Sequence, residues 1–105
     1  MSAMTNRGEV WLVDLGYAAK IRPCLIFSIK AEDTDRALTT VVVHTTTVRG
    51  TDFEVSLNIR FLKEGAFDAQ NILSVSHAKF VRKLGSLTDA QMQQVEDAVK
   101  DWLNL

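Results

Sequence analysis

Residues 21–28, with the sequence IRPCLIFS, decide how this chain folds. The run from Cys24 to Phe27 is apolar and includes branched and aromatic side chains, which is typical of a buried β-strand. Pro23 has no N–H to give to a neighbouring strand, so it is tolerated at the first position of a strand, where it also favours an extended backbone for Arg22. The sequence therefore predicts a strand with the Arg22 guanidinium held at the rim of a hydrophobic core.

Length and composition predict one globular domain that spans residues 1–105, with a polar, frayed lead over residues 1–6. The chain is 47% hydrophobic and 24% charged, a balance that excludes a disordered or fibrous protein. It has neither a signal-peptide pattern nor an apolar stretch near the ~20 residues that a membrane span requires. We therefore expect a cytoplasmic protein without a membrane partner.

The formal net charge of −1 argues against a general polyanion binder, because nonspecific affinity for nucleic acid grows with the number of phosphates neutralised. The acidic residues are concentrated in residues 32–36 and 89–101, however. The remainder of the chain is more basic than the average, so a local cationic surface is compatible with the composition.

Strand character recurs along the first three quarters of the chain. The connection over residues 16–20 is too short for a crossover helix and predicts an antiparallel hairpin. Residues 38–47 carry the strongest β signal and are expected to form a central strand. An irregular segment is expected over 61–68 and a short helical turn over 77–81. Five or six strands are predicted, of which five are assigned to residues 9–15, 22–28, 38–47, 53–57 and 71–76.

A single α-helix is predicted after a linking segment over residues 82–87. Thr88 and Gln91 have the spacing of a capping box. An apolar stripe follows at helical spacing, which is typical of packing against a core rather than of a ligand site. The fold class is therefore α+β: a small, antiparallel, barrel-like sheet with a C-terminal helix. The stripe consists of Met92, Val95, Val99 and Trp102.

No metal, phosphate-loop or nucleotide-binding signature is present in the sequence, and no cofactor is expected. Arg22 offers a permanent planar cation for a phosphate or a carboxylate, and a structural ion pair with Asp14 or Glu54 is an equal alternative. His44 is a candidate acid or base, although a lone strand histidine is more often structural. Cys24 is expected to be a buried thiol without a catalytic role.

Five stretches together resemble the MazF/PemK toxins of bacterial type II toxin–antitoxin systems. The similarity extends over nearly the whole chain, and the order and spacing of the stretches are more specific than any one of them. They are residues 7–11 (RGEVW), 22–26 (RPCLI), 45–50 (TTTVRG), 53–55 (FEV) and 84–88 (LGSLT).

The resemblance implies an SH3-like barrel of the CcdB/MazF kind that forms a homodimer. It also implies metal-independent cleavage of single-stranded RNA and neutralisation by a cognate antitoxin. The catalytic pair of that family falls on Arg22 and Thr45. Guanidinium is a poor base but a good fixed cation, so Arg22 is expected to stabilise the charge of the phosphorane while Thr45 holds a non-bridging oxygen.

RNA contacts are expected from Tyr17, Lys20, Thr46 and Arg49. The connection over residues 16–20 is shorter than in many members of that family, so the RNA sequence preference does not transfer. Tyr17 is suited to stacking on a base or simply to packing, and Lys20 to meeting a phosphate. Two other functions are compatible with the fold: a protein-binding poison such as the gyrase-directed relatives, and a silent binding module.

Overall fold

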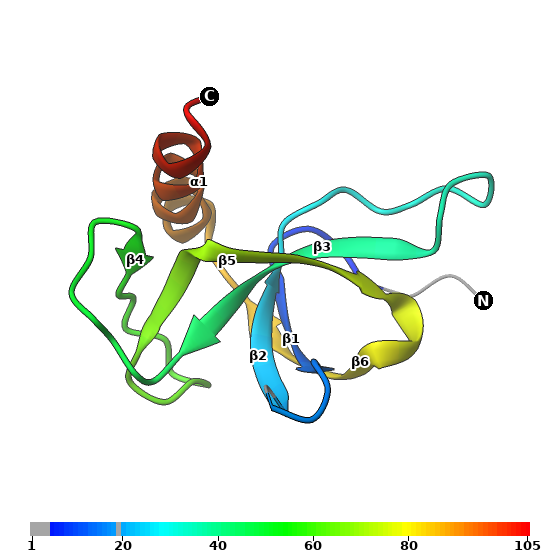
Figure 1. The fold of residues 1–105 in the computed structure, drawn as a ribbon, viewed down its shortest axis with the longest axis horizontal. Helices are drawn as coiled ribbons and strands as arrows, with labels where there is room; N and C mark the ends of the chain where they lie inside the picture. Colours follow the sequence, from blue (N-terminus) through cyan, green and yellow to red (C-terminus); the bar gives the residue numbers. More distant parts are fainter. Residues whose placement is uncertain (1–4, 19) are drawn as a thin grey trace.

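The computed structural model describes residues 5–18 and 20–105, and the order of their elements confirms an α+β fold (Figure 1). Six strands precede one α-helix, and a 3-10 turn links the fifth and sixth strands. The elements are β1 (Glu9–Asp14), β2 (Ile21–Ile26), β3 (Leu38–Thr45), β4 (Glu54–Val55), β5 (Ala66–Ser76), η1 (His77–Lys79), β6 (Phe80–Ser86) and α1 (Asp89–Leu103).

All six strands belong to one antiparallel sheet with the order β4-β5-β3-β2-β1-β6. The β1–β2 pair is the expected hairpin, and β3 is the expected central strand between β2 and β5. β4 and β6 are the two edge strands, so the sheet is open. It is strongly curved (Figure 1) and therefore resembles a barrel without closing into one.

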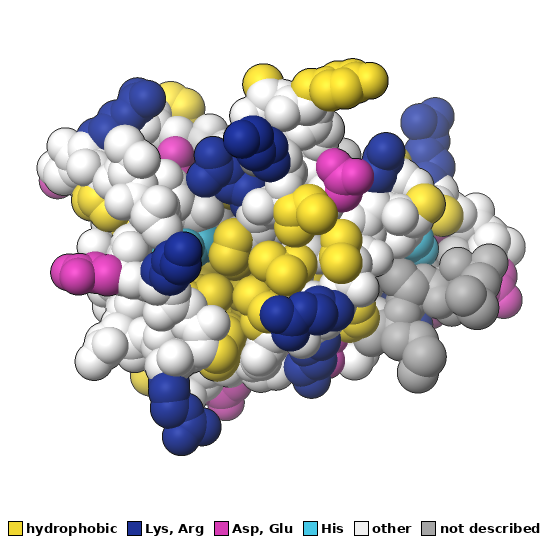
Figure 2. All heavy atoms as spheres, turned by 90° about the horizontal axis from the view of Figure 1, so that it is seen from below, with side chains coloured by type: hydrophobic (Ala, Val, Ile, Leu, Met, Phe, Trp, Pro, Cys, Tyr) yellow, Lys and Arg dark blue, Asp and Glu magenta, His cyan; other side chains and the backbone are white. Residues whose placement is uncertain are grey.

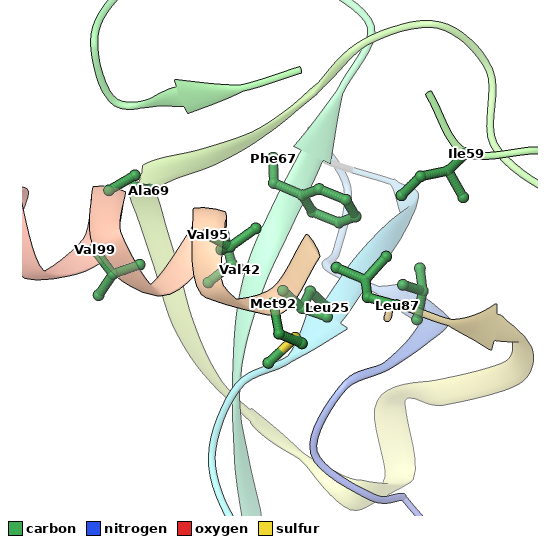
Figure 3. Packing of buried hydrophobic residues seen from close by; sticks show 11 residues of the cluster. Leu25, Val42, Ile59, Phe67, Ala69, Leu87, Met92, Val95 and Val99 are labelled. Carbon is green, nitrogen blue, oxygen red and sulfur yellow. The ribbon is translucent and has the colours of Figure 1, made fainter. Parts of the chain in front are cut away.

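Both faces of the sheet are covered, which explains why the strand sequences do not alternate cleanly between apolar and polar residues. One face packs against α1, and Figure 3 shows Met92 and Val95 of the helix beside Leu25 and Val42. The curvature of the sheet encloses a second apolar cluster on the other face. The buried members of that cluster are Val13, Cys24, Ile26, Val41, Val43 and Val75.

The predicted capping box is present at the start of α1. The Thr88 hydroxyl accepts a hydrogen bond from the Gln91 backbone N–H at 3.2 Å, and the Gln91 side chain accepts one from the Thr88 N–H at 2.8 Å. Three members of the apolar stripe are buried. Trp102 is half exposed, and its ring lies 5.2 Å from that of Phe53.

Strand β5 departs from the expected pattern, because it extends the strand expected over 71–76 back to Ala66, while residues 61–65 of the expected irregular segment lie outside any strand. Its register against β3 jumps from Val42–Ile72 to Val43–Asp68, so residues 69–71 form a bulge. A bulge breaks the regular pairing and bends the strand. Residues 66–68 resume regular pairing with β3 on the other side of the bulge.

The sequence did not predict β6 as a strand, because β6 is an edge strand that carries charged residues. Arg82 and Lys83 are exposed, and such residues protect an edge strand from pairing with other chains. The helical turn expected over 77–81 is confirmed only for His77–Lys79, since Phe80 already belongs to β6.

Two further expectations need correction. β4 has only two residues in place of the expected five. The lead is not frayed at its end: Thr5 is buried, and the Asn6 N–H donates to the Glu9 carboxylate at 2.9 Å. Residues 1–4 of the expected frayed lead lie outside the described residues.

Candidate functional site

Arg22 is the second residue of β2, just outside the ladder that β2 forms with β3. That ladder begins at Cys24, and Pro23 is paired with Leu12 of β1. Pro23 is therefore the third residue of the strand rather than the first, but it still stands where β3 requires no N–H from it. As expected from the sequence, Arg22 is an extended residue at the end of a buried run of apolar residues.

Thr45 is the last residue of β3 and lies on the same face of the sheet as Arg22. Cys24 pairs with Val43, and continuing this register by two residues places Arg22 beside Thr45. Side chains of one strand repeat on the same face every second residue. Both side chains line one open pocket with a volume of about 360 Å³. The structure thus brings two residues that are far apart in the sequence to a common surface.

The same pocket contains charged side chains of both signs. Arg49 comes from the loop after β3, Glu54 from β4 and Asp68 from β5. The pocket therefore offers two guanidinium groups for an anion, with two carboxylates across from them. Figure 2 shows the face that carries the β1–β2 connection and the end of β3, where hydrophobic side chains gather at the centre with Lys and Arg around them.

The Thr45 hydroxyl is held in a turn at the end of β3. It accepts a hydrogen bond from the Thr47 backbone N–H at 3.0 Å. A local bond of this kind orients a hydroxyl that would otherwise rotate freely. The hydroxyl also donates a long hydrogen bond to the Thr47 carbonyl at 3.4 Å, and it would have to exchange this bond for one to a ligand oxygen.

Glu54 organises the loop that carries Arg49. Its carboxylate accepts the backbone N–H of Arg49 at 2.8 Å and that of Thr51 at 2.7 Å. These backbone hydrogen bonds, from Arg49 first and then Thr51, lower the pKa of Glu54. Gly50, between the two donors, has a φ of +76°, which glycine adopts without strain. The loop conformation therefore depends on an ionised Glu54.

His44 is a structural residue in this arrangement. It is 4% exposed, and its ring contacts the Phe67 ring edge-on at a centroid distance of 5.0 Å. Phe67 belongs to the cluster under α1, so the imidazole points to the face opposite Thr45. Burial lowers the pKa of His44, which keeps the ring neutral at neutral pH.

Three predicted RNA contacts do not line the pocket. Tyr17 is fully exposed in the β1–β2 connection. Lys20 ends that connection with a left-handed φ of +57°, and its N–H donates to the Gly16 carbonyl at 2.6 Å. Thr46 lines a neighbouring groove of about 780 Å³ together with Gly65. Among the proposed residues, Arg22, Thr45 and Arg49 share one pocket.

Asp68 is a charged pocket residue that sequence reasoning missed, as it missed the polar lining residues Thr47, Thr51, Gln70 and Asn71. It fell within a segment that was expected to be irregular, so no strand register was assigned to it. Only the pairing of Val43 with Asp68, beside the bulge, places its carboxylate near Thr45. No local motif in the sequence could have indicated this.

Cys24 is fully buried, and burial raises the pKa of its thiol to about 12. A thiol in this state is a poor nucleophile, as the sequence predicted. Among residues 5–18 and 20–105, no group of three or more His, Cys, Asp and Glu side chains is arranged to hold a metal ion. No helix in the same part of the chain is long and apolar enough to cross a membrane.

Comparison with known proteins places this chain in a family. The model of the PemK-like, MazF-like toxins of type II toxin–antitoxin systems matches residues 6–103. A relative from Mycobacterium tuberculosis, "Probable endoribonuclease MazF5", is 31% identical over 103 residues, which cover 95% of this chain and 94% of the relative.

Solved structures agree in fold with this chain. An endoribonuclease in complex with its cognate antitoxin, from a mycobacterial species, is 31% identical with a TM-score of 0.83, and 96% of each chain is covered. A second mycobacterial endoribonuclease is 28% identical with a TM-score of 0.82, covering 100% of this chain and 96% of the other. MazF in a MazE–MazF crystal structure from Deinococcus radiodurans, at 19% identity with a TM-score of 0.80 and 96% of each chain covered, shows the fold alone.

The family match covers almost the entire chain, and the fold is that of the solved relatives. This chain therefore belongs to the PemK-like, MazF-like toxins of type II toxin–antitoxin systems.

Proposed function

We propose that this protein is an endoribonuclease that cleaves single-stranded RNA without a metal ion and thereby inhibits translation and growth. The observation that carries the proposal is the shared pocket of Arg22 and Thr45. Its two guanidinium groups, from Arg22 and Arg49, suit a phosphodiester.

In the proposed reaction, the 2′-hydroxyl of one nucleotide attacks the adjacent phosphorus and the P–O5′ bond breaks. Arg22 neutralises the charge that accumulates on the phosphorane, a role that a fixed guanidinium can fill without changing its protonation. Thr45 donates a hydrogen bond to a non-bridging oxygen and so fixes the orientation of the phosphate. Arg49 binds a neighbouring phosphate at the mouth of the pocket.

The remaining predicted contacts belong to the path of the RNA outside the pocket. Tyr17 is free to stack on a base, and Lys20 lies on the same connection to meet a phosphate. Thr46 extends the site into the neighbouring groove. The toxin acts in the cytoplasm as a homodimer, to which exposed apolar residues such as Ile21 and Val81 are suited.

A cognate antitoxin is the proposed protein partner. The mycobacterial endoribonuclease at 31% identity has been solved in complex with its own antitoxin. A flexible antitoxin segment that covers the pocket would exclude RNA from Arg22 and Thr45 and so neutralise the toxin.

Primer extension on a long, mixed-sequence RNA tests the proposal and reports the cleavage sequence at the same time. The wild-type protein is expected to cut the RNA at discrete sites in the presence of EDTA. Intact RNA at high protein concentration would contradict the proposal. Intact RNA together with topoisomerase inhibition would identify a protein-directed poison, and the absence of growth arrest on expression would identify a silent binding module.

A further inference from the structure

We propose that the Asp68 carboxylate takes the proton from the attacking 2′-hydroxyl. This inference rests on the proposed ribonuclease activity and assigns a step that Arg22 and Thr45 leave open. A guanidinium remains protonated, and a threonine hydroxyl is a weak base, so neither can accept this proton at neutral pH.

The strand register places Asp68 on the same face as the proposed catalytic pair. Asp68 pairs with Val43, two residues before Thr45, while Thr45 itself pairs with Ala66. Residues at such diagonal positions of an antiparallel pair lie about 7–8 Å apart. Both side chains line the same pocket.

The bulge over residues 69–71 fixes the direction of the Asp68 side chain. The first residue of the bulge, Ala69, donates its N–H to the Phe53 carbonyl at 2.8 Å. Gln70 donates its N–H to Asp68 Oδ1 at 3.0 Å. Bulges of this kind are found next to active sites, where they redirect a side chain. One carboxylate oxygen is thus anchored to the backbone.

Two other groups in the pocket are poorer acceptors. Both oxygens of Glu54 are engaged by backbone N–H groups, which stabilise its ionised form and weaken it as a base. The His44 ring packs on Phe67, on the opposite face of β3 from Thr45. Asp68 lies on the face of Thr45 and accepts one backbone N–H, from Gln70, where Glu54 accepts two.

The proposed step conserves atoms and charge. The 2′-O–H proton passes to Asp68, the 2′-oxygen forms a bond to phosphorus, and the P–O5′ bond breaks. The leaving 5′-oxygen takes a proton from water, and the neutral Asp68 returns its proton to solvent. The products are a 2′,3′-cyclic phosphate and a 5′-hydroxyl end.

Charged side chains of both signs line the pocket with Asp68. Arg22 from β2 and Arg49 from the loop after β3 face it with positive charge, and Glu54 is directly paired with it across β4 and β5. His44 also lines the pocket and is neutral. Because Glu54 is a second carboxylate in the same pocket, a variant is needed to attribute the proton transfer to Asp68.

Asp68→Asn tests the proposal, because its amide oxygen can still accept the Gln70 N–H while the base is lost. We measure kcat and KM from pH 5 to pH 9 on a short oligoribonucleotide that spans a mapped cleavage site. A general base contributes about 10²–10⁴-fold, so kcat should fall by that factor while KM stays the same or decreases. The residual rate should rise with pH throughout the range, because hydroxide replaces the carboxylate.

Asp52→Asn is the matched control, an exposed carboxylate on the same loop as Arg49 that does not line the pocket. It should retain the wild-type kcat and pH profile. An Asp68→Asn protein with a wild-type kcat, or with a lower kcat but an unchanged pH profile, would overturn the role of Asp68 while leaving the ribonuclease proposal intact. A wild-type protein that leaves the RNA uncut would overturn both.

Discussion

The Thr45 hydroxyl illustrates how much a single polar atom contributes at the scale of the residue. It accepts the Thr47 N–H and, in the proposed reaction, donates to a phosphate oxygen. A valine has the same shape without either capacity, so Thr45→Val isolates the hydroxyl.

Thr45→Val should lower kcat about 10²–10³-fold, because one donor to a developing oxyanion is worth that much. Thr45→Ser should retain most of the activity. Single-turnover cleavage of a short RNA measures both. Thr40→Val, at the opposite end of β3, is the control and should cleave like the wild type. Equal rates for Thr45→Val and the wild type would remove Thr45 from the mechanism.

The residues of the site differ in how far the sequence could identify them. Arg22 was found from its place before Pro23, and Thr45 from its place at the end of a β-branched run, with the family resemblance supplying their roles. Asp68 could not be found, because its position depends on a bulge created by pairing with a distant strand. A local sequence pattern does not specify the pairing register between two strands that are distant in the sequence.

At the scale of elements, the Glu9 carboxylate of β1 forms an ion pair with β6. Its carboxylate accepts hydrogen bonds from Trp11 Nε1 at 3.0 Å and from the Asn6 N–H at 2.9 Å, and it pairs with Lys83 Nζ at 3.1 Å. Burial alone would raise the pKa of Glu9, but these bonds outweigh it and lower the pKa from 4.5 to about 2. The edge strand β6 therefore depends on an ionised Glu9.

Because the folded protein has the lower pKa, the stabilisation from Glu9 is complete above pH 4.5 and is lost as the pH falls to about 2. The shift corresponds to about 3 kcal/mol. Glu9→Gln should reduce the free energy of unfolding at neutral pH and should flatten its decrease in that acid range. Urea denaturation at several pH values measures this.

Glu32→Gln, in an exposed loop, is the control for Glu9 and should follow the wild-type pH dependence. If Glu9→Gln loses stability with acid as steeply as the wild type does, the Glu9 cluster is not responsible for the effect.

Gly65 holds the end of β3 against the start of β5. A Cβ at this position would overlap the Thr45 carbonyl oxygen and lie 2.8 Å from His44 Cε1. Gly65→Ala should therefore cost about 1–3 kcal/mol of stability and, by displacing Thr45, also lower kcat. Urea denaturation and RNA cleavage at a temperature where the variant is folded measure the two effects. An unchanged free energy of unfolding together with an unchanged kcat would show that β3 and β5 can move apart at this point without consequence.

Elements with strong local signals were predicted, and those stabilised by distant partners were not. The hairpin, the central strand and the capped helix each carry their own pattern of turn length, β-branching or capping residues. β6 lacks such a pattern, because its exposed charged residues serve an edge and its position depends on β1. β4 was predicted within residues 53–57, and only its restriction to two residues depends on its pairing with β5.

At the scale of the whole molecule, the site is a consequence of the curved sheet. The order β4-β5-β3-β2-β1-β6 brings residues of β2, β3, β4 and β5 to one pocket, while α1 covers the opposite face of β3 and β5. The α+β class with an antiparallel sheet and a C-terminal helix could be predicted from the sequence. The openness of the sheet and the charge balance of the pocket required the structure.

The central claim is that Arg22 and Thr45 act together on one phosphate, and a double-mutant cycle tests it most directly. The single-turnover rate of RNA cleavage is measured in EDTA for the wild type, Arg22→Ala, Thr45→Val and the double variant, with folding checked by circular dichroism. Residues that act as a unit are not additive, so the double variant should be little slower than the slower single variant, a coupling of about 1 kcal/mol or more. Independent, additive losses, or wild-type cleavage by a folded Arg22→Ala protein, would contradict the account.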